Sequence, residues 1–149
     1  MSFLDLCAGS GAVGIEALSR GARHATFVDQ SRTMCALVKS NLDLCKIDES
    51  EGAVVQSEAQ EYLRNAIAQQ PGASAFDIVF FDPPYANDYL PILESLGAHA
   101  SSLFTANGLL IIEHHHKNEL KDKVGSIIRS RVLKQGDSAL SFYQQADRS

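Results

Sequence analysis

Short apolar runs alternate along this chain with longer segments in which apolar residues recur every three or four positions. Side chains of a strand alternate between two faces, whereas those of a helix repeat every 3.6 residues, so the runs predict strands and the longer segments predict helices. The apolar runs fall at residues 3–7, 25–28, 53–55, 76–81 and 108–113. The segments with helical spacing fall at residues 12–20, 31–45, 59–68, 88–104 and 118–124.

The helix expected over residues 31–45 has the clearest signals. Ser31 is a good N-cap residue, because its hydroxyl can accept a hydrogen bond from a backbone amide of the first turn. The apolar side of this helix is expected to consist of Cys35, Leu37, Val38, Leu42 and Leu44.

The C-terminal part of the chain has a different pattern. Residues 127–135 and 139–144 flank Gly136-Asp137-Ser138, which is typical of a β-hairpin turn. The alternation of strands and helices before it predicts βαβ units on a mostly parallel sheet, here closed by an antiparallel hairpin. We expect an α/β fold with seven strands in a single domain over residues 1–149, which is an ordinary domain length.

Composition places the chain among ordinary folded proteins. Apolar residues make up 45% and charged residues 21%, which argues against a disordered segment. No apolar run approaches the ~20 residues of a membrane helix, and Met1–Asp5 has no export-signal pattern. Cys7, Cys35 and Cys45 lack the spacing of metal ligands, so we expect free thiols, no metal site and a cytoplasmic location.

The formal net charge of −5 is unfavourable for a protein that binds nucleic acid, because lysine and arginine contacts to phosphate supply most non-specific affinity. The distribution of the positive charges is uneven, however. Arg129, Arg131 and Lys134 cluster near the C-terminus, and Arg20 and Arg23 flank a glycine.

The most informative motif is Asp82-Pro83-Pro84-Tyr85, which directly follows the apolar run 76–81. Proline fixes its own φ, has no N–H, and pushes the preceding residue into an extended conformation, so the chain cannot continue as a helix here. The Asp82 carboxylate and nearby backbone carbonyls then suit the amino group of an aromatic ring, and the Tyr85 ring offers a stacking surface. A plain proline-rich turn after a strand is the alternative.

A glycine-rich loop follows the first strand, at Gly9-Ser10-Gly11-Ala12-Val13-Gly14, and Asp29 lies twenty residues after Gly9. This spacing is also the fingerprint of dinucleotide-binding folds, so a dehydrogenase is a competing interpretation. Asp5 argues against it, because a carboxylate within the first strand would repel a pyrophosphate and attract a ligand with an ammonium and a sulfonium. The proline motif also has no role in hydride transfer.

Together these motifs resemble the RsmD-type methyltransferases, which modify the exocyclic N2 of a guanine in bacterial 16S rRNA with S-adenosylmethionine. The resemblance rests on the segments 5–11, 14–22 and 82–85, and it extends over essentially the whole chain to the closing hairpin. It implies the class I S-adenosylmethionine-dependent methyltransferase fold, which is Rossmann-like. The implied partner is ribosomal RNA, within the small ribosomal subunit or its assembly intermediate.

The resemblance also implies roles for individual residues. The backbone of Ala8, Gly9 and Gly11 would receive the methionine part of the cofactor, and Asp5 would support its amino group. Asp29 would hold the ribose diol. The adenine amine would lie near the Glu58 side chain and the Ala59 backbone, although Asp or Asn is more usual in the family at the position of Glu58. Catalysis would fall to the residues of the proline motif: Asp82, Pro83, Pro84 and Tyr85.

Two features fit the family pattern less closely. RsmD-type proteins carry a basic segment ahead of the glycine strand, whereas this chain begins at that strand, so we expect a truncated catalytic domain. Three consecutive histidines, His114-His115-His116, follow the fifth predicted strand. Adjacent strand residues point to opposite faces, so three such imidazoles cannot all bind one ion, and a rim that meets phosphate or substrate is the preferred interpretation.

Two further functions remain open from the sequence. The proline motif is shared with adenine-N6 and cytosine-N4 methyltransferases, so a DNA amino-methyltransferase is one alternative. A cofactor-binding module that has lost catalysis is another.

Overall fold

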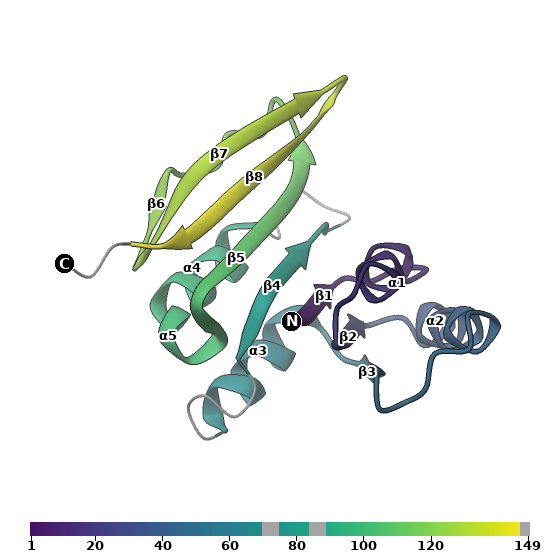
Figure 1. Ribbon diagram of the computed structural model, residues 1–149. Coiled ribbons are helices and arrows are strands. Elements are labelled where there is room, and N and C mark those ends of the chain that lie inside the picture. Colours follow the sequence, from purple (N-terminus) through teal and green to yellow (C-terminus); the bar gives the residue numbers. More distant parts are fainter. Residues whose placement is uncertain (70–74, 84–88, 147–149) are drawn as a thin grey trace.

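The computed structural model describes residues 1–69, 75–83 and 89–146, and these form one eight-stranded mixed sheet flanked by helices (Figure 1). The strand order is β3-β2-β1-β4-β5-β8-β7-β6. The strands are β1 (Ser2–Leu6), β2 (His24–Asp29), β3 (Gly52–Gln56), β4 (Phe76–Phe81), β5 (Phe104–His115), β6 (Lys123–Val124), β7 (Ile127–Gln135) and β8 (Ser138–Gln145). The helices are α1 (Ala12–Ser19), α2 (Arg32–Leu44), α3 (Ala59–Ala68), α4 (Tyr89–Ala98) and α5 (Ala100–Leu103).

Each face of the sheet is covered by its own set of helices. On one face, α1 and α2 enclose a core around Phe27 and Val38. On the other face, α3, α4 and α5 enclose a larger core around Leu63, Leu96 and Leu110. Parallel strands need helices on both faces, which explains why most residues of β1 and β4 are apolar.

The direction in which successive strands are added to the sheet reverses at β1. From β1 the chain moves outward to β2 and β3, and it returns to place β4 on the opposite side of β1, followed by β5. The parallel register pairs Leu6 with Val28 and with Phe81, and Phe81 with Ile112, so the carboxyl ends of β1, β2, β4 and β5 lie at one edge. In open α/β sheets, ligands bind outside the strand ends at such a reversal.

The packing of α1 on β2 depends on one glycine. A Cβ atom at Gly14 would collide with the ring of Phe27, which is fully buried. The glycine therefore allows α1 to approach the sheet closely, and this fixes the position of the loop that precedes the helix.

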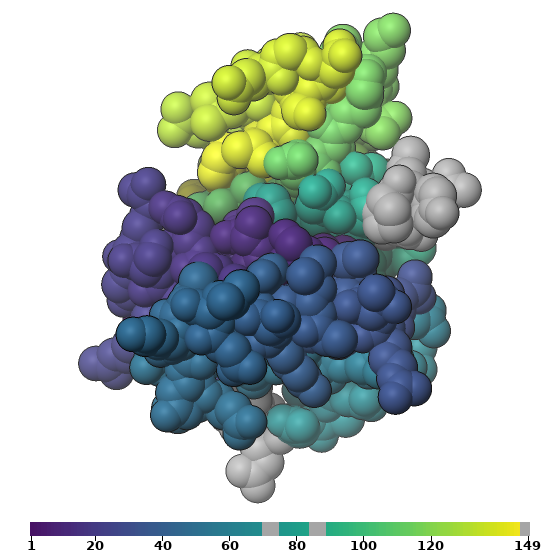
Figure 2. Space-filling view, turned by 90° about the vertical axis from the view of Figure 1, so that its right-hand side faces the viewer, coloured from purple at the N-terminus to yellow at the C-terminus, as the bar shows by residue number. Residues whose placement is uncertain are grey.

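The C-terminal strands extend the sheet antiparallel to β5. The β7–β8 hairpin rises beyond the α1 and α2 side of the molecule, as Figure 2 shows for its yellow-green surface. Gly136 takes a φ of 60° in the turn, a conformation that favours glycine. The predicted hairpin and mostly parallel sheet are confirmed.

Three predictions about secondary structure are wrong. Residues 118–124 form no helix; Lys123–Val124 instead pairs with β7 as a short eighth strand, where seven were expected. The single helix expected over 88–104 is two helices separated at His99, and its last predicted residue, Phe104, begins β5. Position 88 itself lies outside the described residues.

The N-cap of α2 is confirmed, because the Ser31 hydroxyl accepts a hydrogen bond of 3.2 Å from the Met34 amide. Its apolar side is narrower than expected. Cys35, Val38 and Leu42 are buried, whereas Leu37 is 40% and Leu44 78% exposed. Leu44 is the last residue of α2, where the chain turns away from the surface of the sheet into the loop before β3.

No helix within the described ranges is long and apolar enough to cross a membrane.

Candidate active site

The loop after β1 has an alternating backbone conformation. Cys7, Gly9 and Gly11 have φ values of 65°, 57° and 82°, and the residues between them do not have positive φ. Such alternation turns successive backbone groups toward a common concavity, which is a recurrent way to bind a charged ligand group. The loop ends where Gly11 caps α1.

The amides of the three predicted loop residues are engaged within the protein. The Ala8 amide donates to the Val28 carbonyl, the Gly9 amide to Asp29 Oδ2, and the Gly11 amide to the Ala8 carbonyl, each at 2.9 Å. These bonds fasten the loop to the end of β2. The Ala8 and Gly11 carbonyls also accept bonds within the chain, from the Gly11 and Ile15 amides. That this backbone receives a ligand stays a prediction.

Asp29 joins three segments at the strand ends. Its Oδ2 accepts from Gly9 and its Oδ1 from the Ser31 amide at 2.9 Å, while its own carbonyl accepts from Ser57 at 3.0 Å. A carboxylate oxygen can accept more than one hydrogen bond, so both oxygens retain capacity for a ligand hydroxyl.

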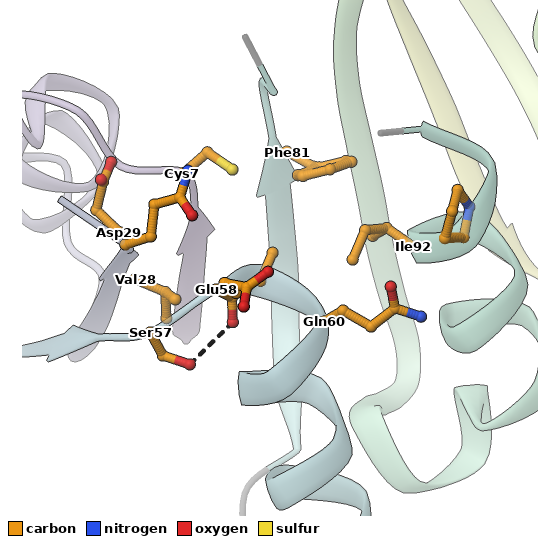
Figure 3. Close-up of a pocket in the computed structure, with 11 residues that line it drawn as sticks. Cys7, Val28, Asp29, Ser57, Glu58, Gln60, Phe81 and Ile92 are labelled. Carbon is orange, nitrogen blue, oxygen red and sulfur yellow. Dashed lines mark hydrogen bonds between the residues drawn. The ribbon is translucent and has the colours of Figure 1, made fainter. Parts of the chain in front are cut away.

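A cleft of about 220 Å³ opens beside Asp29, on the α3 and α4 side of the sheet. Figure 3 shows Glu58 at the start of α3, between Asp29 and Gln60, with the Phe81 ring at the end of β4. The lining residues are Cys7, Val28, Asp29, Gln30, Ser57, Glu58, Ala59, Gln60, Phe81, Pro91 and Ile92. The structure thus brings together three residues singled out from the sequence, at positions 29, 58 and 59, within one cleft.

Asp5 is a buried carboxylate at the centre of the sheet. It is 2% exposed, and its Oδ2 has no hydrogen-bond partner among the described residues. Burial raises the pKa of Asp5 to about 7; the Gly14 amide lowers it, and the carboxylates of Asp82 and Asp29 raise it further. A buried acceptor without a partner is costly unless a ligand supplies the missing donor.

Asp82 follows the last residue of β4, next to the end of β1. Burial of its carboxyl group raises the pKa of Asp82 to about 6, and contact with the Glu113 carboxylate adds to the effect. Asp82 as a whole residue is exposed and the next residue, Pro83, is buried. Asp82 therefore lies at the rim of the site, next to a buried residue. Pro84 and Tyr85, the other predicted catalytic residues, lie outside the described residues.

Glu113 is a site residue that the sequence interpretation missed. It ends the apolar run of β5, beside Asp82 on the neighbouring strand, and its side chain is half-buried. The available signal was its position, since an acid at the carboxyl end of a central strand faces the same edge as Asp5 and Asp82. The Tyr89 hydroxyl donates to the Glu113 carbonyl at 3.1 Å and fixes the backbone there.

The three histidines have separate environments. His114 is buried, with Nε2 2.8 Å from the Ser141 hydroxyl, whereas His115 and His116 stack outside with ring centroids 4.7 Å apart. Three imidazoles therefore do not converge. The possible ligand atoms of His115, His116 and Asp137 do lie within 4.8 Å of one another, and Asp137 joins this group from the hairpin turn, which the spacing of the histidines does not reveal.

Acidic groups dominate the edge of the sheet at which the carboxyl ends of β1, β2, β4 and β5 lie. Asp82 and Asp29 both raise the pKa of Asp5, and Glu113 acts in the same way on Asp82, so four acidic groups influence one another. Like charges at close range favour protonation or the binding of a cation. The edge therefore suits a ligand that carries positive charge close to β1.

This topology, with its glycine loop and acidic strand ends, defines the class I fold of S-adenosylmethionine-dependent methyltransferases. The solved structure of YhhF from Escherichia coli, described as a candidate methyltransferase, superposes with a TM-score of 0.82 at 30% identity and covers 99% of this chain and 78% of that chain. A more distant fold neighbour, SMU.776, was solved with SAH and has a TM-score of 0.72 at 17% identity.

The chain belongs to the RsmD-type family, whose model, described as conserved hypothetical protein 95, matches residues 1–144. It is 34% identical over 142 residues to YlbH of Bacillus subtilis, named as a candidate rRNA methyltransferase. The aligned region covers 95% of this chain and 74% of YlbH. It is 32% identical to the ribosomal RNA small subunit methyltransferase D of Escherichia coli K12, over 95% of this chain and 67% of that protein. The resemblance found in the motifs is thus confirmed.

Proposed function

We propose that this methyltransferase uses S-adenosylmethionine to methylate the exocyclic N2 of a guanine in 16S rRNA. The observation that carries the proposal is the position of Asp82 beside Asp5, which brings the first residue after β4 and the glycine strand to one edge of the sheet. The RNA substrate is supported by the relatives named as small subunit rRNA methyltransferases, and guanine N2 by the family resemblance.

The residues at this edge fit the cofactor. Its sulfonium and ammonium groups are cationic, and the unpartnered Oδ2 of Asp5 lies within the acidic edge. Asp29 retains acceptor capacity for ribose hydroxyls, and Glu58 lines the same cleft. When bound, S-adenosylmethionine supplies an electrophilic methyl group.

Asp82 and Pro83 would orient the acceptor amine. The lone pair of a ring-attached amino group is delocalised into the base, so the amine is a poor nucleophile. If the Asp82 carboxylate and the Pro83 carbonyl each accept one N–H, the amine is held with its lone pair directed away from both acceptors. Positioning of this kind can contribute about 7–11 kcal/mol to lowering a barrier.

The proton balance requires no strong base. As the nitrogen gains a methyl group it loses one proton, and that proton is acidic once the nitrogen is positively charged. Asp82, with a pKa of about 6, can take it and pass it to water. The residue therefore has two tasks, to orient the amine and to remove its proton.

The target base has to be accessible to this edge. A base must leave its stack to reach the strand ends, at a cost of a few kcal/mol, and looped or single-stranded RNA reduces that cost. Arg129 and Arg131 on β7 offer positive charge on the hairpin, although Arg129 already pairs with Asp122.

The test is incubation of the chain with tritiated S-adenosylmethionine and small ribosomal subunits from cells that lack the modification, followed by nucleoside analysis. The proposal predicts label in N2-methylguanosine of 16S rRNA. Label in DNA but not RNA would support an amino-methyltransferase acting on DNA instead. Cofactor binding without any transfer would support a binding module.

A further inference from the structure

Glu113 and Asp82 form a pair of carboxylates at the carboxyl ends of the neighbouring parallel strands β5 and β4. The register pairs Phe81 with Ile112, so the next residues along the chain, Asp82 directly after β4 and Glu113 in β5, lie side by side at the carboxyl edge. The Glu113 carboxylate raises the pKa of Asp82, so the two carboxyl groups lie close together.

The backbone of Glu113 is held in place by contacts with two other elements. It still pairs with Leu140 of β8, and its carbonyl accepts from the Tyr89 hydroxyl. The ring of Tyr89 is in turn fixed by edge-on contacts with Phe81 and His114, at centroid distances of 6.2 and 6.1 Å. A group fixed in this way is suited to reading the shape and hydrogen bonds of a ligand.

The atoms beside the reactive amine differ among the bases. In guanine the 2-amino group is flanked by N1–H, a donor, and by N3, an acceptor. In adenine and cytosine the amino group is flanked on the Watson–Crick edge by a ring nitrogen without hydrogen. An ionised carboxylate next to Asp82 thus pairs with guanine and is repelled by the lone pair of the other two bases.

We propose that Glu113 selects guanine, by accepting the N1–H of the base whose 2-amino group is held by Asp82. This inference rests on the proposed function and adds the source of base specificity to it. A second acceptor also explains an otherwise unfavourable arrangement, because two adjacent carboxylates repel each other until donors are placed between them. Guanine provides three such donors on this edge, one at N1 and two at N2.

The test compares guanine with 2-aminopurine, which has the same 2-amino group but lacks the N1–H. The small subunit is reconstituted with 2-aminopurine at the guanine that the parent chain methylates, and single-turnover rates are measured for both substrates. The parent is expected to prefer guanine by at least about 100-fold, since sites built to bind a substrate donor reject an analogue without it by up to roughly 10⁴–10⁵-fold. Methylation of the guanine substrate by the parent tests the proposed function separately from the inference.

Variants of Glu113 then distinguish a role in recognising the base from a purely structural role of this residue. Glu113→Ala is expected to abolish the preference for guanine: the guanine rate falls because its N1–H loses an acceptor, and the 2-aminopurine rate does not fall because a repulsive contact is removed. In Glu113→Gln the amide can donate to N1 of 2-aminopurine, so this variant is expected to methylate 2-aminopurine faster than the parent does. Glu49→Gln, an exposed position in the loop before β3, is the matched control.

A purely structural role would lower both rates by the same factor in Glu113→Ala and preserve the preference for guanine. That outcome would overturn the inference while leaving the proposed function standing. A parent chain that does not methylate the guanine substrate would refute the proposed function, and the base-reading role of Glu113 with it.

Discussion

The Gly9 amide donates a hydrogen bond of 2.9 Å to Asp29 Oδ2, so the carboxylate at the end of β2 holds the loop at the end of β1. The other oxygen of Asp29 accepts from Ser31 at the start of α2. One side chain thus organises the two segments between which the cofactor is expected to lie.

Asp29→Ala is expected to weaken S-adenosylmethionine binding by at least about tenfold, which corresponds to ~1.4 kcal/mol. The variant removes both the predicted ribose contact and the acceptor for Gly9. Isothermal titration calorimetry measures the affinity, with Asp43→Ala on the exposed side of α2 as the control. An affinity equal to that of the parent would show that the ribose contact is misassigned.

The buried Asp5 predicts a specific dependence of stability on pH. Its pKa is about 7 in the folded chain and about 3.9 when unfolded, so the folded state binds more protons between these values. The free energy of unfolding therefore decreases as pH rises from about 4 to 7, by on the order of 3 kcal/mol from this group.

Asp5→Asn removes this titration with little change in shape. Relative to the parent, the variant is expected to gain stability between pH 4 and pH 8, as measured by urea unfolding at both values. A stability difference that does not change with pH would mean that Asp5 is ionised in the folded chain throughout this range.

Much of the fold could be predicted because β1, β2 and β4 are apolar runs that end at a glycine loop or an acid. Residues 118–124 could not be predicted, because Leu120 and Val124 are spaced as in a helix but are buried against distant elements. Gly97 of α4 approaches the Val124 carbonyl so closely that a Cβ would collide with it. This tertiary contact, together with pairing to β7, decides the conformation in place of local propensity.

The candidate site was predicted unevenly for a similar reason. Asp5, Asp29 and Asp82 belong to motifs with a recognisable order, and the structure places them at one edge. Glu113 belongs to no such motif, and only the register between β4 and β5 brings it to Asp82. The sequence shows only an acid near the end of a strand, and the strand pairing that brings it to Asp82 has no local signal.

Gly14→Ala tests the close packing of α1 on the sheet. Alanine favours a helix by about 1 kcal/mol over glycine, but overpacking costs ~1–3 kcal/mol, and the fully buried Phe27 ring has little room to move. We expect a lower free energy of unfolding by thermal or urea denaturation. Val13→Ala, at a 40% exposed neighbouring position, is the control, and a stabilised Gly14→Ala would contradict the packing described.

The raised pKa of Asp82 predicts the pH dependence of catalysis. Only the ionised carboxylate can accept an N–H from the amine, so kcat/KM is expected to fall as pH decreases through about 6. Of the acidic groups that face Asp82, Glu113 raises its pKa directly, and Asp5 lies next to it on β1.

Glu113→Gln should move the midpoint of this profile to lower pH, because it removes a neighbouring negative charge. The midpoint should stay above the usual aspartate value, since burial is the larger cause and remains. A midpoint that stays fixed or moves upward would show that Asp82 does not govern the profile.

The central claim is that Asp82 orients the acceptor amine at the edge where Asp5 and the glycine loop hold the cofactor. It is tested most directly by measuring methyl transfer and S-adenosylmethionine affinity together in Asp82→Ala. We predict that transfer to the small subunit falls by more than about 100-fold, while the dissociation constant of the cofactor changes by less than about threefold. A variant that still transfers methyl groups at a rate close to that of the parent would contradict the account.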